Sequence, residues 1–227
     1  MYKRKILIGT DTTSGIAPQI LEAISEASKK STLPYGNDIF TKKCKNIVKE
    51  IFEKKDLEII PMMSGTASNS LALSSFLRSY GSVICHSNSH INKDEGGAPE
   101  FFSGGGKLLT ISNSSGRFQV DDLIKKIEEI NFKGKLNPVI SGVSITQLAE
   151  NGTLYSLDEI DAISKICKFY NLYLHMDGAR FTNALVTQDA VSPAEATWKI
   201  GVDCLSLGAT KNGAMAAEII IFFNKEL

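Results

Sequence analysis

Short apolar segments that alternate with amphipathic ones constrain this chain most strongly. Apolar runs typical of buried strands lie at 56–62, 82–85, 107–111, 139–145, 172–176, 203–207 and 218–223. Apolar residues recur at helical spacing at 16–30, 40–54, 119–130, 157–170 and about 178–186, and a segment rich in small residues follows Thr66. Apolar strands that alternate with helices predict an α/β fold, with a mostly parallel sheet covered by helices on both faces.

Length and charge limit the number of domains and the kind of partner. The 227 residues suit a single domain over 1–227, with a substantial core. The 25 basic and 25 acidic residues balance, so no bulk charge favours nucleic acid or an acidic membrane, and a small-molecule partner is expected. No apolar run approaches the ~20 residues that span a bilayer, so we expect a cytoplasmic protein without membrane contact.

The cysteines carry no metal-binding or disulfide pattern. They stand far apart in the chain, at Cys44, Cys85, Cys167 and Cys204. No C-x-x-C pair is present, and no cysteine clusters with histidine at the spacing of a zinc site. We therefore expect reduced, buried thiols and no metal centre.

The first candidate site is the loop between the strand at 56–62 and the helical segment that follows it. In a parallel sheet, ligands bind beyond the carboxyl ends of the strands. Ser64, Gly65 and Thr66 occupy such a place. Glycine lets the backbone approach an anion, and a helix N-terminus offers unpaired N–H groups, so a phosphate would fit there. Ordinary capping of the helix by serine is the alternative.

The second candidate site is the segment H-M-D-G-A-R at 175–180, which ends an apolar strand. Asp177 could pair with a cationic ring nitrogen, and Arg180 could hold a carboxylate through its planar guanidinium. A surface Asp–Arg pair that closes a turn is the alternative for these two residues.

The third candidate site is Lys211, which follows the strand at 203–207 among small residues in the run G-A-T-K-N-G. Small neighbours leave room for a ligand beside the amine, as Schiff-base chemistry requires. A phosphate cradle, an aspartate and a lysine, each after a strand, form the arrangement that pyridoxal phosphate (PLP) requires. The order of the three loops is therefore more specific than any one of them.

Motifs along nearly the whole chain resemble those of the threonine aldolases, a family of low-specificity L-threonine and L-allo-threonine aldolases. The matched segments are 10–15 (T-D-T-T-S-G), 34–38, 64–69 (S-G-T-A-S-N), 89–100, 143–147, 150–157, 174–185 and 206–218. The resemblance implies the large PLP-binding domain of the aspartate-aminotransferase-like enzymes of fold type I. It also implies a homodimer or homotetramer with an amino-acid substrate.

The resemblance carries cofactor roles to matched positions. Lys211 would bind PLP through a Schiff base, and Asp177 would keep the pyridine nitrogen protonated. Gly65 and Thr66 would bind the phosphate. His90 would stack on the ring, although an ordinary loop histidine is the alternative. Lys211, His90 and Asp177 are thus the expected catalytic residues.

Arg180 and Thr10 are the expected substrate-binding residues, and Arg180 would also lie near the cofactor. Glu95 falls in a matched segment, but the resemblance gives it no role. The reaction implied is cleavage of threonine or allo-threonine to glycine and an aldehyde, and the sequence leaves the choice between these substrates open.

Two departures from the family pattern keep other functions open. No histidine lies between His90 and His175, where many members have one, and the chain stops at Leu227, so we expect the small C-terminal domain of the family to be absent. The chain could therefore be a truncated paralogue that binds PLP weakly without turnover. A related PLP-dependent β-eliminating lyase or aminotransferase is the other alternative.

Overall fold

A computed structural model describes residues 9–13, 15–132, 134–188 and 190–227. Its centre is a seven-stranded sheet of order β1-β7-β6-β5-β4-β2-β3. The strands are β1 (Glu58–Met62), β2 (Gly81–His86), β3 (Lys107–Ile111), β4 (Val139–Thr146), β5 (Tyr173–Gly178), β6 (Cys204–Gly208) and β7 (Glu218–Phe222). β7 is antiparallel to both of its neighbours, and the other pairings are parallel. The predicted α/β class with a mostly parallel sheet is confirmed.

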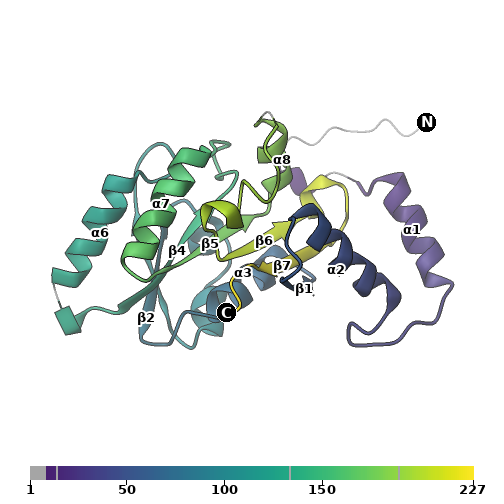
Figure 1. Ribbon diagram of the computed structural model, residues 1–227, viewed down its shortest axis with the longest axis horizontal. Helices are drawn as coiled ribbons and strands as arrows, with labels where there is room; N and C mark the ends of the chain where they lie inside the picture. Colours follow the sequence, from purple (N-terminus) through teal and green to yellow (C-terminus); the bar gives the residue numbers. More distant parts are fainter. Residues whose placement is uncertain (1–8, 14, 133, 189) are drawn as a thin grey trace.

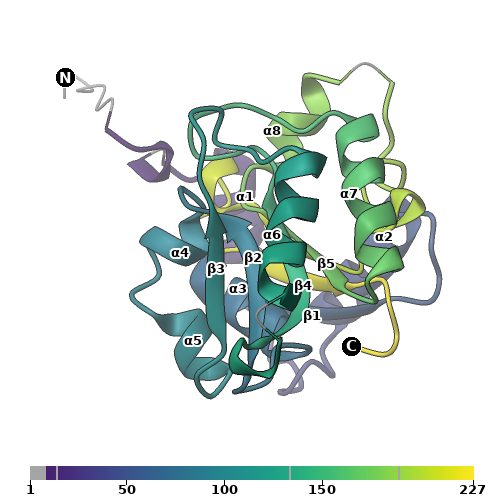
Figure 2. The same ribbon diagram turned by 90° about the vertical axis from the view of Figure 1, so that its left-hand side faces the viewer.

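Helices cover both faces of this sheet (Figures 1 and 2). The α-helices are α1 (Pro18–Ser28), α2 (Ile39–Ile51), α3 (Gly65–Ser74), α4 (His90–Lys93), α5 (Ala98–Phe102), α6 (Val120–Phe132), α7 (Leu157–Phe169) and α8 (Phe181–Val186). Short 3-10 helices are η1 (Asp11–Thr13), η2 (Gly134–Leu136), η3 (Trp198–Ile200) and η4 (Thr210–Asn212). In the described residues, no helix has the length and apolar content to cross a membrane.

The core lies on both faces of the sheet because successive side chains of a strand point to opposite sides. Val83 and Cys85 of β2 pack in the cluster beside α3, whereas Ile84 packs in the larger cluster beneath α6 and α7. α3 buries mainly small side chains, which allow its backbone to approach the strands closely. Among its buried residues, Ala72 and Leu73 are completely inaccessible. This close approach brings α3 against the strands that carry the candidate site.

Some expectations need correction. The strand at 56–62 was expected to be buried, but β1 is an edge strand on which only Ile59 is buried. Pro61 is tolerated there because an edge strand need not donate every N–H to a ladder. The cysteines are free as expected, although Cys44 is only half-buried. α1 buries none of its residues and stands apart from the sheet in Figure 1.

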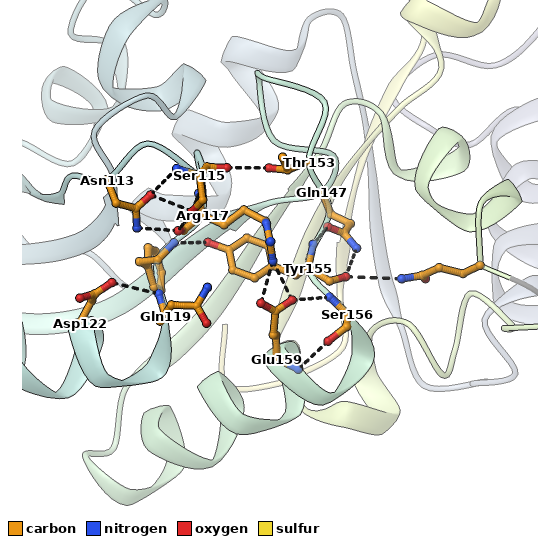
Figure 3. A network of polar contacts seen from close by, with 12 residues as sticks. Asn113, Ser115, Arg117, Gln119, Asp122, Gln147, Thr153, Tyr155, Ser156 and Glu159 are labelled. Atoms are coloured by element: carbon orange, nitrogen blue, oxygen red, sulfur yellow. Dashed lines mark hydrogen bonds and ion pairs between the residues drawn. The ribbon is translucent and has the colours of Figure 1, made fainter.

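A polar network fixes the segment that joins β4 to α7 (Figure 3). The Tyr155 hydroxyl, which is buried, accepts a hydrogen bond from the Phe118 N–H at 3.1 Å. The Gln147 side-chain amide accepts from the Tyr155 N–H at 3.0 Å and donates to its carbonyl at 2.9 Å. Arg117 Nη1 lies 2.7 Å from both carboxylate oxygens of Glu159. These contacts hold the loop after β4 at the carboxyl edge of the sheet.

The Tyr155 hydroxyl gives a test of this network. Tyr155→Phe should lower the free energy of unfolding by about 1–3 kcal/mol, because the buried Phe118 N–H loses its acceptor. Urea unfolding near neutral pH measures the change. Tyr80→Phe is the matched control, since Tyr80 is 70% exposed, and it should stay within about 0.5 kcal/mol of the parent. Equal effects of the two substitutions would contradict the role given to the network.

Candidate active site

The candidate residues gather at one edge of the sheet. β1, β2, β4, β5 and β6 run in the same direction, so the loops that follow them emerge on the same side. These loops carry Gly65, His90, Glu150, Arg180 and Lys211. The register supports this grouping, because Asp177 of β5 pairs with Ser206 of β6, and Gly208 of β6 pairs with Glu218 of β7. The three loops singled out in the sequence therefore face a common region.

Asp177 is a buried acid at the end of β5, with 2% of its surface exposed. Its Oδ2 accepts a hydrogen bond from Asn69 Nδ2 at 3.0 Å, and its Oδ1 accepts one from the Ala179 N–H at 3.1 Å. The alternative of a surface Asp177–Arg180 pair is wrong, because Arg180 pairs with other acids. A carboxylate held inside the protein by neutral donors can still bind a cationic group.

His90 belongs to a polar group that the sequence only partly indicated. Its Nδ1 lies 2.9 Å from Glu95 Oε1, and the same oxygen accepts from Asn69 Nδ2 at 2.8 Å. The hydrogen bond with Glu95 raises the pKa of His90, and burial raises the pKa of Glu95. Asn69 and Glu95 lie in matched motifs, but only the tertiary structure shows that both contact the site.

The N-terminus of α3 forms an open cradle. Ser64 Oγ accepts from the Ala67 N–H at 3.2 Å, so the expected serine cap is present. In the described part of the chain, no acceptor is found for the N–H groups of Gly65 and Thr66. A Cβ placed on Gly65 would meet no atom nearer than Glu218 Oε2, at 4.0 Å. Capping and anion binding are therefore compatible here.

Glu218 is a second buried acid, beside this cradle. Thr210 Oγ1 donates to its Oε1, and burial raises the pKa of the carboxyl. A Cβ on Gly208 would lie 2.8 Å from Glu218 Oε2 and 3.0 Å from the Ala179 Cα, so a side chain where β6 ends would displace the Glu218 carboxyl. Sequence reasoning gave Glu218 no role, although the residue ends the matched segment 206–218, because it also begins an apolar strand.

Lys211 lies on η4, directly beyond β6, and is half-buried. It forms no hydrogen bond or ion pair with any described residue. The N-terminal segment is fixed beside its loop, because the Ala17 N–H donates to the Gly213 carbonyl at 2.9 Å. The N-terminal segment therefore lies beside the loop that carries Lys211, whose amine makes no hydrogen bond or ion pair within the described ranges.

Arg180 joins the same edge to the N-terminal segment. Its Nε lies 2.5 Å from Asp11 Oδ2, and its Nη1 lies 3.3 Å from Glu150 Oε2. Burial opposes the charge, but these acids raise the pKa of Arg180. Thr10, the residue before Asp11, is exposed, and its carbonyl accepts a hydrogen bond from Thr13 Oγ1 at 2.8 Å. The two residues expected to bind substrate therefore lie on neighbouring segments.

His175 has a different environment from His90. It is fully buried, with Nδ1 2.9 Å from Ser144 Oγ and Nε2 3.0 Å from Ser206 Oγ. Burial lowers the pKa of His175 to about 4. A neutral ring that joins β4, β5 and β6 supports the strand ending at Asp177.

Comparison with known proteins places the chain in a family. The family model for beta-eliminating lyases matches residues 8–227. The curated low-specificity L-threonine aldolase of Pseudomonas aeruginosa is 43% identical over 221 residues, which cover 96% of this chain and 62% of that protein. A threonine aldolase structure from Leishmania major has a TM-score of 0.89 and 30% identity, and the match covers 96% of this chain and 62% of the other.

More distant structures show the fold alone. An archaeal alanine:glyoxylate aminotransferase is 18% identical with a TM-score of 0.69, over 92% of this chain and 52% of its own. The expected fold type I architecture is thereby confirmed. The chain spans 62% of the length of the Pseudomonas aeruginosa relative. Because the family model matches residues 8–227, the chain belongs to the beta-eliminating lyase family.

Proposed function

We propose that this chain is the cofactor-binding portion of a PLP-dependent lyase that cleaves threonine or allo-threonine to glycine and an aldehyde. The observation that carries the proposal is the meeting, at one edge of the sheet, of a buried acid, an open helix N-terminus and a lysine that has no partner among the described residues. The threonine aldolases among the relatives support the choice of reaction.

The residues present fit PLP by their chemistry. The free N–H groups of Gly65 and Thr66 suit its phosphate, Asp177 suits its ring nitrogen, and the amine of Lys211 suits its aldehyde. The site also contains two buried acceptor atoms without a partner among the described residues, Asn69 Oδ1 and Glu95 Oε2. When bound, PLP supplies an electron-poor ring that accepts the electrons released at Cα.

The chain's own residues would prepare this chemistry. Lys211 would hold the cofactor covalently, and Asp177 would keep a proton on the ring nitrogen. His90 would lie against the ring face, with Nδ1 engaged by Glu95 and Nε2 left to exchange a proton with the substrate. Arg180, with its charge already shared by two acids, would orient the substrate carboxylate together with Thr10.

The remaining expectations belong to the same proposal. Residues 1–227 would form the large PLP-binding domain, and the protein would be a cytoplasmic homodimer or homotetramer that contacts neither nucleic acid nor membrane. Size-exclusion chromatography with light scattering, on the protein loaded with PLP, measures the oligomeric state. A strictly monomeric loaded protein would contradict the oligomer.

β-Elimination is the second candidate, because the matching family model is described by that reaction. The two reactions leave different products. Aldol cleavage of threonine releases an aldehyde and glycine, whereas elimination releases a keto acid and ammonia. Separate assays of aldehyde and keto acid from threonine distinguish them. Keto acid alone would favour elimination, and neither product with PLP bound would favour the impaired paralogue.

Lys211 provides the first test. Purified protein mixed with PLP should develop a visible absorption band that Lys211→Ala abolishes, because the band requires a Schiff base with that amine. Lys165→Ala, an exposed lysine on α7, is the matched control and should retain the band. A folded parent without the band would refute PLP binding.

Asp177 provides a test that separates binding from turnover. Asp177→Asn should reduce aldehyde release from threonine by about 100-fold, because an amide cannot stabilise a protonated ring nitrogen as a carboxylate does. The dissociation constant for PLP should change by much less, since the phosphate and the Lys211 contacts remain. Absorbance titration and an aldehyde assay give the two values. Equal losses of both would argue against this role.

Glu218 gives a prediction for pH. Below its raised pKa, the neutral carboxyl can donate a hydrogen bond to the phosphate, and above that pKa the carboxylate repels it. PLP affinity of the parent, relative to Glu218→Gln, should therefore fall as pH rises. Dissociation constants measured at several pH values for both proteins test this. Glu58→Gln, an exposed acid at the other end of β1, should keep a constant ratio to the parent.

A further inference from the structure

We propose that Asn69 and Glu95 are positioning residues that join His90 and Asp177 into one hydrogen-bonded unit. The inference rests on the proposed function, in which His90 faces the PLP ring and Asp177 its nitrogen. It adds that Glu95 fixes the orientation and charge of the His90 ring, and that Asn69 connects this pair to Asp177.

The contacts form a continuous chain. Asp177 Oδ2 accepts from Asn69 Nδ2 at 3.0 Å, and the same nitrogen donates to Glu95 Oε1 at 2.8 Å. Glu95 Oε1 lies 2.9 Å from His90 Nδ1. The four residues come from three places in the sequence, namely α3, the segment that contains α4, and the end of β5. This series of hydrogen bonds therefore links Asp177, the proposed partner of the ring nitrogen, to His90, the proposed partner of the ring face.

Asn69 suits its place because a side-chain amide offers two N–H donors on one nitrogen. Both of its partners are carboxylates, so the nitrogen faces them and its oxygen is left without a partner. Asn69, Glu95 and Asp177 are all buried, with 2%, 6% and 2% of their surface exposed. An aspartate at position 69 would place a third buried acid beside these two, and an apolar residue would leave both without this donor.

The support for this amide is rigid. Asn69 lies on the buried face of α3 between Ser68 and Ser70, which are also buried. α3 packs on the strands, and a side chain on such a helix is held more firmly than one on a loop. The helix therefore fixes Asp177 and Glu95 relative to each other, and through Glu95 it fixes His90.

Three acids from different parts of the chain act on His90. Glu95 bonds to it from its own segment, Asp177 approaches from β5, and Glu150 approaches from the loop after β4. The Glu95 hydrogen bond is the largest influence that raises the pKa of His90. Glu95 thus favours a proton on Nδ1 and leaves Nε2 available for the proposed contact with the cofactor or substrate.

The apo protein gives a direct test, because the pKa of His90 should lie above those of the other two histidines, His86 and His175. The pKa values of His86 and His175 are lowered by burial, whereas that of His90 is raised. NMR of the ring resonances, with His90→Gln for assignment, follows each titration. Glu95→Gln should lower the pKa of His90 by about one pH unit or more, because a neutral amide replaces the carboxylate.

Asp94→Asn is the matched control for charge. Asp94 is the neighbouring acid and is exposed, so its removal should leave the His90 titration nearly unchanged. An unchanged pKa in Glu95→Gln, or equal shifts in both variants, would overturn the role of Glu95. Thermal unfolding of each variant shows that it is folded before it is titrated.

Asn69 is tested by an effect at a distance. Asn69→Ala should raise the pKa of His90, because Glu95 loses a donor and its carboxylate becomes a stronger acceptor for the protonated His90 ring. Asn69→Ser is the second variant if the alanine variant does not fold. An unchanged His90 titration in the folded variant would reduce Asn69 to a packing role and overturn the link.

PLP binding connects the unit to the proposed function. Glu95→Gln should weaken PLP affinity by about tenfold, because His90 is no longer held against the ring, while Asp94→Asn should not. A parent that never develops the visible band would refute the proposed function and leave the apo titrations valid. A parent that binds PLP, with unchanged affinity in Glu95→Gln, would refute the positioning role alone.

Discussion

The burial of the Asp177 carboxylate is the constraint on which the rest of the site depends. A charge removed from water must be compensated by hydrogen bonds or by an opposite charge. Here the compensation comes from the Ala179 N–H and from Asn69, and no described cation contacts the carboxylate. These two neutral donors hold the carboxylate in place without neutralising its charge. The carboxylate is therefore suited to a ligand that brings a positive charge.

Several elements far from Asp177 serve this arrangement. His175, two residues earlier on β5, bonds to serines on both neighbouring strands and stays neutral. The network around Tyr155 holds the loop after β4 (Figure 3). This loop brings Glu150 to Arg180. Arg180 in turn binds Asp11 and so attaches the N-terminal segment. Rigid strands and polar links together make a site from loops that are distant in sequence.

Some charged side chains of the site are paired with an opposite charge, and others are not. Arg180 is shared by Asp11 and Glu150, and His90 is paired with Glu95, whereas Lys211 has no partner among the described residues. A lysine that interacts by charge with the buried acid Glu218, but has no hydrogen bond or ion pair in the described part of the chain, is consistent with a site that is completed by a ligand. The same reasoning applies to the free N–H groups at the start of α3, which suit an anion.

The sequence alone determined the order and type of the main elements, because apolar periodicity reports which segments are buried. The strand at 107–111 and the helix at 157–170 lie where the pattern predicted them, within a residue. Short helices such as α4 and α5 were missed, because one turn is too short to show a period. The residue types of the candidate site could also be predicted, since Asp177 and Lys211 each follow a strand. Only the tertiary structure decided the partners, because hydrogen bonds from α3 to Glu95 and β5, and from η4 to β7, join residues that no local pattern relates. The contacts of Asn69, Glu95 and Glu218 with the site could therefore be found only in the folded structure.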